Sequence, residues 1–308
     1  MKNVIQKVSI PVCGVMLGTA ALGNLLQSYS EIIRYICGAF AGFLLVLVLL
    51  KLMLFYGKVK EELGNPILAS VAGTFPMSLM LLSTYIKPFV GRAAFYIWMF
   101  AIVLHIALII YFTAHFIVKL QLQKVFASYY IVYVGIVVAA VTAPVYGRPG
   151  IGNMAFWFGF VCLGALFVLV TYRYLNIKEI PESAKSLVCI YAAPVSLCIV
   201  GYIQSVTPKS KVFLLGMLTV STTLYVFALV KAVTFLKLPF YPSMAAFTFP
   251  FVISATAAKQ TVECLAGMRC PLPVLKVAVL AETFIAVLFV VYVYVRFMMA
   301  LFSKNNCR

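Results

Sequence analysis

Apolar runs of about 20 residues recur along this sequence from one end to the other, and each can cross about 30 Å of hydrocarbon as an α-helix. The runs lie near 8–28, 35–56, 66–86, 93–118, 126–146, 152–174, 186–206, 212–236, 243–262 and 274–302. Only 10% of the residues are charged, whereas a soluble domain carries about 25%. The sequence therefore predicts an all-α membrane protein, with ten transmembrane helices in one domain that spans residues 1–308.

The charged residues are strongly biased towards lysine and arginine. Aspartate is absent, and 24 basic residues against seven glutamates give a net charge of +17. The basic residues stand singly or in pairs, which argues against nucleic acid as a partner and favours the lipid bilayer and anions. With ten spans, the side that holds both termini carries fifteen basic residues and the other side nine, so the positive-inside rule places both termini in the cytoplasm. The expected location is the inner or plasma membrane of the cell.

Odd-numbered runs differ from even-numbered runs. Even runs are long and rich in Leu, Val, Ile and Phe, whereas odd runs are richer in Gly, Ala, Ser, Thr and Pro. Proline breaks the helical hydrogen-bond ladder, and freed backbone groups are tolerated mainly against protein or in a water-filled cavity. The pattern favours five helical hairpins around an axis, with the odd helices inside. Ordinary close packing of small residues is the alternative for any single helix. Helix kinks are expected at Pro76, Pro144, Pro194 and Pro250.

The motif Thr-Phe-Pro occurs in the third and ninth runs and suggests a constriction at one depth. Phe75 lies thirteen residues beyond Glu62, and Phe249 lies twelve beyond Lys237. At about 1.5 Å per residue, both phenylalanines are expected near the middle of the bilayer. An apolar constriction can gate a pore by excluding water, so Phe249 and Phe75 are candidate gates. In the fifth run Pro144 lies too far along, and Gly135 is closer to the shared depth. The predicted pore-lining residues are Gly14, Gly18, Ala20, Gly135, Ala193 and Thr248.

No charged residue falls in the central part of the odd runs, which disfavours cation conduction and proton coupling. Anions are expected to be held weakly, by the hydroxyls of Thr19, Thr74 and Thr248 and by polarised backbone groups. Glu282 in the tenth run leaves a second possibility open, a proton-coupled carrier. A Glu282 side chain that faces the pore would favour the carrier. A Glu282 side chain that faces another helix, where it would pair with Lys276 or a neighbour, would favour the channel.

Little in the sequence supports catalysis or metal binding. His105 and His115 share one run but lie ten residues apart, and we interpret both as packing or interface residues. The eight cysteines show no zinc-site spacing. Cys264 and Cys270 share one loop, so a disulfide between them is possible. We expect no enzyme activity, no cofactor and no metal.

The assembled features resemble the tellurite-resistance/dicarboxylate transporter family, which includes bacterial tellurite-resistance proteins and the slow-type anion channels of plant guard cells. The resemblance covers essentially the whole chain. It is carried by Pro11-x-x-Gly14-x-x-x-Gly18, by Tyr133-Val-Gly135-Ile-Val and by Ala246-Phe247-Thr248-Phe249-Pro250.

This resemblance implies quasi-fivefold symmetry, kinked odd helices around a central pore, and a homotrimer in which each protomer has its own pore. It also implies that Phe249 matches the occluding phenylalanine of the family. The expected function is an anion channel for small anions gated by phenylalanine. The alternative is a proton-coupled secondary transporter of tellurite or C4-dicarboxylates.

Overall fold

The computed structural model describes residues 2–303, and this part of the chain is α-helical without a β-strand. Seven helical segments are long and apolar enough to cross a membrane. They are Glu31–Leu54 (α3), Pro66–Val90 (α5 and α6), Ala93–Ile117 (α7 and the π-helical η1), Pro149–Asn176 (α10), Glu182–Ser205 (η4 and α11), Lys211–Phe235 (α12) and Leu275–Phe302 (α14). The prediction of an all-helical membrane protein is confirmed.

The remaining apolar runs form shorter or interrupted helices. The first run gives α2, which α1 precedes; the fifth gives α8, α9 and the 3-10 helix η3; and the ninth gives the 3-10 helix η5 and α13. Their bounds are Lys2–Lys7 (α1), Val12–Leu26 (α2), Tyr129–Tyr133 (α8), Val137–Thr142 (α9), Ala143–Tyr146 (η3), Pro242–Phe247 (η5) and Phe249–Gly267 (α13). Two short helices lie in connections, Tyr56–Leu63 (α4) and Leu122–Lys124 (η2).

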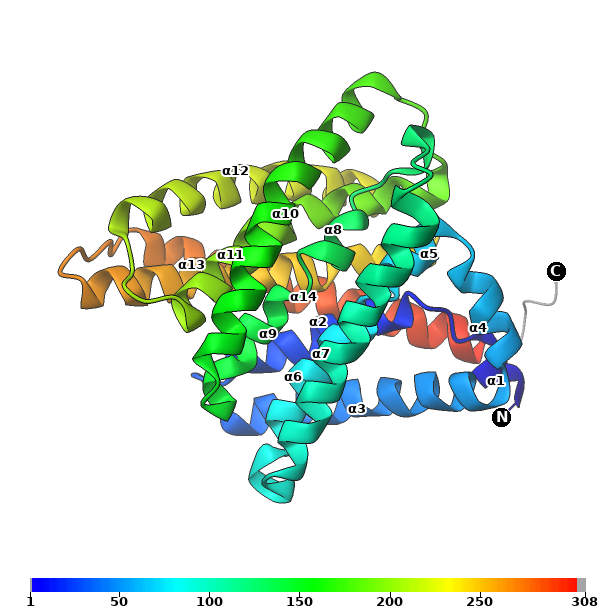
Figure 1. Cartoon of the computed structure of the whole chain (residues 1–308), viewed down its shortest axis with the longest axis horizontal. Helices are drawn as coiled ribbons and strands as arrows, with labels where there is room; N and C mark the ends of the chain where they lie inside the picture. Colours follow the sequence, from blue (N-terminus) through cyan, green and yellow to red (C-terminus); the bar gives the residue numbers. More distant parts are fainter. Residues whose placement is uncertain (1, 304–308) are drawn as a thin grey trace.

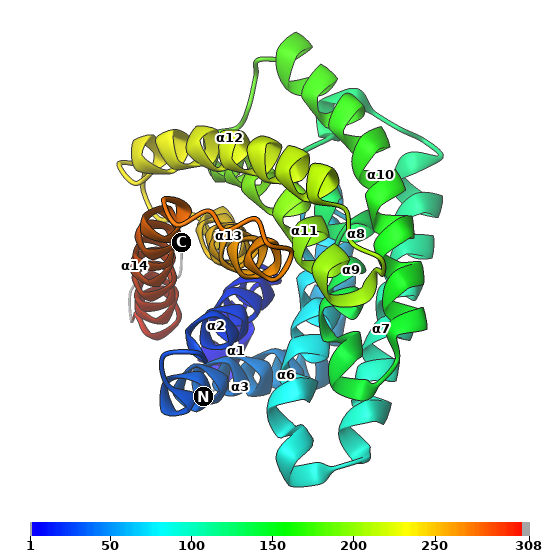
Figure 2. The same cartoon turned by 90° about the vertical axis from the view of Figure 1, so that its left-hand side faces the viewer.

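The uninterrupted helices lie on the outside of the bundle. Figure 2 shows α3, α7, α10, α12 and α14 surrounding α2, α6, α9, α11 and α13. Only 22–33% of the apolar window of each outer helix is buried, against 94% for η4 with α11. Their exposed side chains are mainly apolar, as for Phe100 and Val103 of α7. An apolar surface of this kind suits contact with lipid tails rather than water.

Four of the five inner segments are interrupted within residues 2–303, and the interruptions follow local sequence. The third run breaks at Ala72-Gly73, between α5 (Pro66–Val71) and α6 (Thr74–Val90). The seventh and ninth runs change from 3-10 to α-helix, where η4 (Glu182–Ala192) meets α11 (Ala193–Ser205) and η5 meets α13.

Three of the four prolines expected to kink the inner segments stand in the first turn of a helix. Pro76, Pro194 and Pro250 occupy the first turn of α6, α11 and α13, where proline has no helical N–H partner to lose. Pro144 lies in η3, beyond α9. Near three of the four prolines the inner segment therefore breaks or changes helix type just before the proline, and the fifth run is interrupted earlier, around Gly135.

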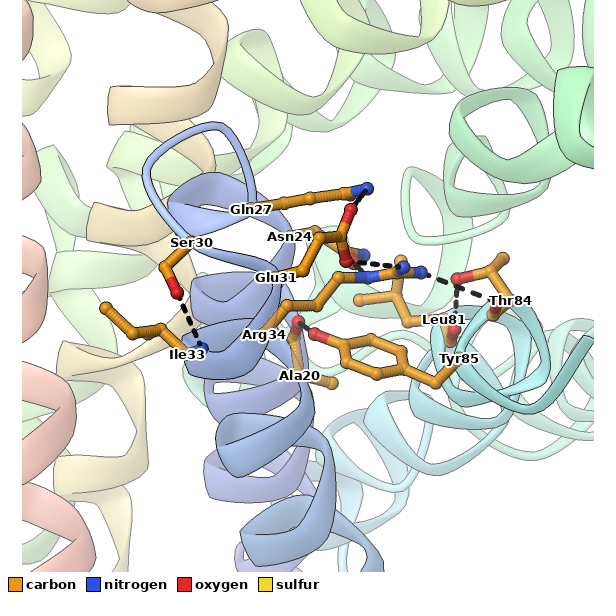
Figure 3. A network of polar contacts seen from close by, with 10 residues as sticks. All are labelled: Ala20, Asn24, Gln27, Ser30, Glu31, Ile33, Arg34, Leu81, Thr84 and Tyr85. Atoms are coloured by element: carbon orange, nitrogen blue, oxygen red, sulfur yellow. Dashed lines mark hydrogen bonds and ion pairs between the residues drawn. The ribbon is translucent and has the colours of Figure 1, made fainter. Parts of the chain in front are cut away.

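Tyr85 holds α6 against the pair formed by α2 and α3 (Figure 3). Its ring fits against Gly38 of α3, where an added Cβ would lie 2.6 Å from the ring. Its hydroxyl donates to the carbonyl of Ala20 in α2 at 2.5 Å. The Arg34 guanidinium lies 4.6 Å from the ring centre and donates to the side chain of Asn24 at 3.2 Å. Close packing of glycine against a ring therefore sets the spacing of α2, α3 and α6.

Both ends of the described chain meet at one end of the bundle, which we call the terminal end (Figure 1). Lys7 Nζ donates to the carbonyl of Ser303 at 2.8 Å. At this end Lys51, a buried residue in the last turn of α3, forms an ion pair with Glu62 of α4. The second oxygen of Glu62 accepts from the N–H of Ile10 at 3.2 Å. One carboxylate therefore holds three segments together.

Glu62→Gln is expected to lower stability by about 3 kcal/mol, because it leaves the Lys51 ammonium buried without its counter-charge. The measurement is the unfolding midpoint of the purified protein in detergent. Glu61→Gln is the matched control, since Glu61 is exposed and is expected to tolerate the change. Equal midpoints for the two variants would contradict this role of Glu62.

Candidate functional site: a central cavity

A cavity of about 280 Å³ lies among the inner segments, and all five of them contribute to its wall. Its lining includes Gly14 and Leu17 of α2, Thr74 and Met77 of α6, Val134 and Gly135 between α8 and α9, Ala193 and Leu197 of α11, and Phe249 of α13. These segments are far apart in sequence and come together only in the centre of the bundle (Figure 2). A cavity built in this way lies where a path through the bundle would run.

The described residues that line the cavity include no charged side chain. Most are apolar, and the polar ones are Asn65, Thr74, Tyr130, Ser183 and Ser243. Such a wall has no carboxylate to hold a cation and no acid–base pair for catalysis. Groups of three or more metal-binding side chains are also absent from residues 2–303.

Three helices begin at the cavity wall. Thr74, Ala193 and Phe249 are the first residues of α6, α11 and α13, and each lines the wall. An α-helix carries about half a positive elementary charge at its N-terminus. The starts of three helices of 13 or more residues therefore lie at the cavity wall, although the N–H of Ala193 already donates to the carbonyl of Ile190 in η4.

Of the predicted gate and pore residues, Gly14, Gly135, Ala193 and Phe249 line the cavity, as do Pro194 and Pro250. Gly18, Ala20 and Thr248 are not among its lining. Gly18 instead allows α2 to approach the start of α13, because an added Cβ would lie 2.4 Å from Cβ of Thr248 and 2.8 Å from the nitrogen of Phe249. Ala20 is fully buried, and its carbonyl accepts from Tyr85.

The threonine hydroxyls are already engaged with backbone carbonyls. Thr248 Oγ1 lies 2.7 Å from the carbonyl of Ala245 and 3.1 Å from that of Gly14. Thr19 donates to Val15 at 2.8 Å, and Thr74 donates to Val71 at 2.7 Å. A hydroxyl has one proton to donate, so these three groups offer none to an anion. In this structure the three hydroxyls therefore donate to backbone carbonyls rather than into the cavity.

Phe75 does not line the central cavity, although it shares its motif with Phe249. It lines a second hollow, on the other side of α6. The two motifs differ by one residue in register, because Thr74 of the first motif lines the cavity, whereas Phe249 lines it in the second. One residue turns a side chain by about 100° around a helix. The prediction that both phenylalanines share one ring is therefore corrected for Phe75.

His105 has a role that the sequence did not reveal. This fully buried side chain of α7 donates through Nε2 to the carbonyl of Val132 at 2.9 Å, next to the break between α8 and α9. Its ring also limits the space at Gly135, where an added Cβ would lie 3.0 Å from Cε1 of His105. His105 thus supports the broken helix from behind the cavity wall. The sequence signal for this role is a histidine in the middle of an apolar span, because a buried histidine needs a hydrogen-bond partner.

His105→Leu is expected to cost about 1–3 kcal/mol of stability, because it leaves the carbonyl of Val132 buried without a donor. His105→Gln keeps a donor and should recover part of the loss. His115→Leu is the control, since His115 lies exposed at the end of the same span. The check is the unfolding midpoint of each variant in detergent; a similar loss for both leucine variants would show that the bond to Val132 adds nothing.

Glu282, Cys264 and Cys270 all lie outside the cavity wall. Glu282 lies on the face of α14 that carries Thr283, Ala286 and Phe289, is 8% exposed, and is not among the residues that line the cavity. That face packs against α13 and α2. Cys264 and Cys270 are free thiols in the structure.

Comparison with known proteins agrees with this geometry. The family of voltage-dependent anion channels (SLAC1) matches residues 7–300, which is nearly the whole chain. No curated protein matches the sequence. The matched family transports anions across membranes and is not a family of enzymes. The chain therefore belongs to the voltage-dependent anion channel family.

Proposed function

We propose that this protein is a passive channel for small anions, and that the anions cross the membrane through the central cavity. The observation that carries the proposal is a wall of five inner segments that has no charged side chain but includes the first residues of α6, α11 and α13. Positive potential from helix dipoles attracts anions, and the absence of a fixed cation keeps binding weak.

In the proposed architecture the chain crosses the membrane ten times, as five hairpins with quasi-fivefold symmetry. Each hairpin pairs an inner segment with an outer helix, as α2 with α3 and α13 with α14. An even number of crossings agrees with the contact between Lys7 and Ser303 at the terminal end. The excess of basic residues on that side supports a cytoplasmic position for both termini, in the inner or plasma membrane. Assembly as a homotrimer follows from the family resemblance.

Phe249 is the proposed gate. It is the first residue of α13, it lines the cavity, and its side chain is 93% shielded by the protein. A phenylalanine ring in a cavity of about 280 Å³ closes the path to water and ions. Because Thr248 and Gly18 fix the backbone at its base, the side chain can move while the start of the helix stays in place.

The second candidate function is a proton-coupled carrier of tellurite or C4-dicarboxylates. Glu282, the acid expected to carry the proton, does not line the cavity, which favours the channel. Purified protein in planar bilayers separates the two. Under gradients of chloride, nitrate or malate, a channel gives reversal potentials that follow the anion alone. A shift of the reversal potential when a pH gradient is added would contradict the passive channel and support coupling.

A further inference from the structure

A second hollow, of about 560 Å³, opens on the outer surface of the bundle between α3 and α7. We call it the α3–α7 groove. Its wall is almost entirely apolar and includes Val48 of α3, Phe75 of α6, and Leu104 and Leu108 of α7. Phe100, which is 60% exposed, stands at its rim. Both flanking helices are predominantly exposed and apolar, so the groove faces the hydrocarbon of the membrane.

The groove and the central cavity share a thin wall. On α6, Thr74 lines the cavity and the next residue, Phe75, lines the groove. At the start of α2, Gly14 lines the cavity and Cys13 lines the groove. Ser78 Oγ joins these two places, since it lies 2.7 Å from the carbonyl of Thr74 and 3.3 Å from that of Cys13. A molecule that displaces Phe75 from the groove side therefore acts on a helix that forms the cavity wall.

The terminal end of the groove carries charged residues with a small excess of positive charge. Lys51 lines the groove and is neutralised by its ion pair with Glu62. Val59 of α4 also lines it, and its neighbours Lys58 and Lys60 are exposed, together with one exposed acid, Glu61. Figure 1 shows α4 beside the end of α3, on the side of the molecule that holds both termini. An apolar channel with lysines at its membrane-surface end matches the two halves of an anionic phospholipid.

We propose that the α3–α7 groove binds the acyl chain of an anionic phospholipid, whose headgroup contacts Lys58 and Lys60, and that its occupancy is transmitted to the central cavity through Phe75 and Thr74. A volume of about 560 Å³ is in the range of about 300–1,000 Å³ that small-molecule sites occupy. The binding site stands independently of the channel. The transmitted effect rests on the proposed function.

Binding is tested by native mass spectrometry of the delipidated, purified full chain with phosphatidylglycerol or phosphatidylcholine. Leu104→Trp and Ala107→Trp fill the groove, and each should weaken phosphatidylglycerol binding on the order of tenfold, since excluding two methylenes from an apolar site has about that effect. Val103→Trp and Ile106→Trp are matched controls on the same helix, exposed but outside the groove, and should bind like the wild type. Lys58→Gln with Lys60→Gln should remove the preference for phosphatidylglycerol while phosphatidylcholine binding stays unchanged.

Wild-type binding in both filled variants would overturn the site. A lower oligomeric state in the filled variants alone would also overturn the site, because the groove would then be a contact between copies of the chain. Transmission is tested by anion flux in phosphatidylcholine vesicles with and without phosphatidylglycerol. The wild type should respond to phosphatidylglycerol, and the filled variants should not. Equal wild-type flux in the two kinds of vesicle would overturn transmission. Absence of flux in both would overturn transmission and the proposed channel together. The binding measurement would still decide the lipid site.

Discussion

Phe249→Ala is expected to raise anion current on the order of tenfold, because it removes the ring that closes the central cavity. The ring is carried by the first residue of α13 and lies against the cavity rather than among packed helices on every side. The measurement is the anion current per inserted protein in planar bilayers. Phe284→Ala, on the exposed face of α14, is the control and should leave the current unchanged.

Stability separates a gating ring from a packing ring. Truncating a packed phenylalanine costs about 3–5 kcal/mol, because it leaves a void among neighbours that cannot relax. Phe249 borders an existing cavity, so its truncation should lower the unfolding midpoint less than that of Phe251, which is fully buried and packs against Phe289. A large loss of stability in Phe249→Ala without added current would assign Phe249 to packing.

Gly18→Ala is expected to cause a large loss of stability, because an added methyl group meets both a side chain and backbone at the start of α13. Its Cβ would lie 2.4 Å from Cβ of Thr248 and 2.8 Å from the backbone nitrogen of Phe249. Backbone cannot move aside as a flexible side chain does, so the cost should be about 3 kcal/mol, at the upper end of the usual range for overpacking. The same displacement moves the base of the gate, and the remaining folded protein should show altered current.

Gly42→Ala is the matched control for this prediction. Nothing lies within 4 Å of an added Cβ at Gly42 in the middle of α3, and alanine is the better helix former. Its unfolding midpoint should be equal to or above that of the wild type. If Gly18→Ala were as stable as Gly42→Ala, the close approach of α2 to α13 would not be the contact that fixes the gate.

The outline of the fold could be predicted from the sequence because it depends on the length and composition of apolar runs. Continuous outer helices and interrupted inner segments follow from where glycine and proline stand. Gly135 could be placed near the cavity by counting residues from the ends of the fifth run. Phe249 could be placed near the cavity by the same counting, and in the structure it is the first residue of α13 and lines the cavity.

Register and hydrogen bonding could not be predicted in this way. Equating the motifs of Phe75 and Phe249 assumes that the same residue of Thr-Phe-Pro lines the cavity in both, whereas Thr74 lines it in the first motif and Phe249 in the second. Ala20 does not line the cavity, and α2 contributes Gly14 and Leu17 to the cavity wall instead. The threonine hydroxyls fold back on their own helices, and the bond from His105 to Val132 joins separate segments. Both features depend on tertiary contacts that single-sequence counting does not contain.

The most direct test of the account places a charge in the cavity of a folded, conducting protein. Ala193 lines the wall at the start of α11, so Ala193→Cys in the Phe249→Ala background offers a thiol on the proposed path. Current is measured before and after a sulfonate-bearing methanethiosulfonate reagent, with the Phe249→Ala parent as the control for native thiols. The account predicts that the anionic adduct suppresses anion current and that a cationic reagent of similar size suppresses it less. Unchanged current after confirmed modification of Cys at this position by the anionic reagent would contradict conduction through the central cavity.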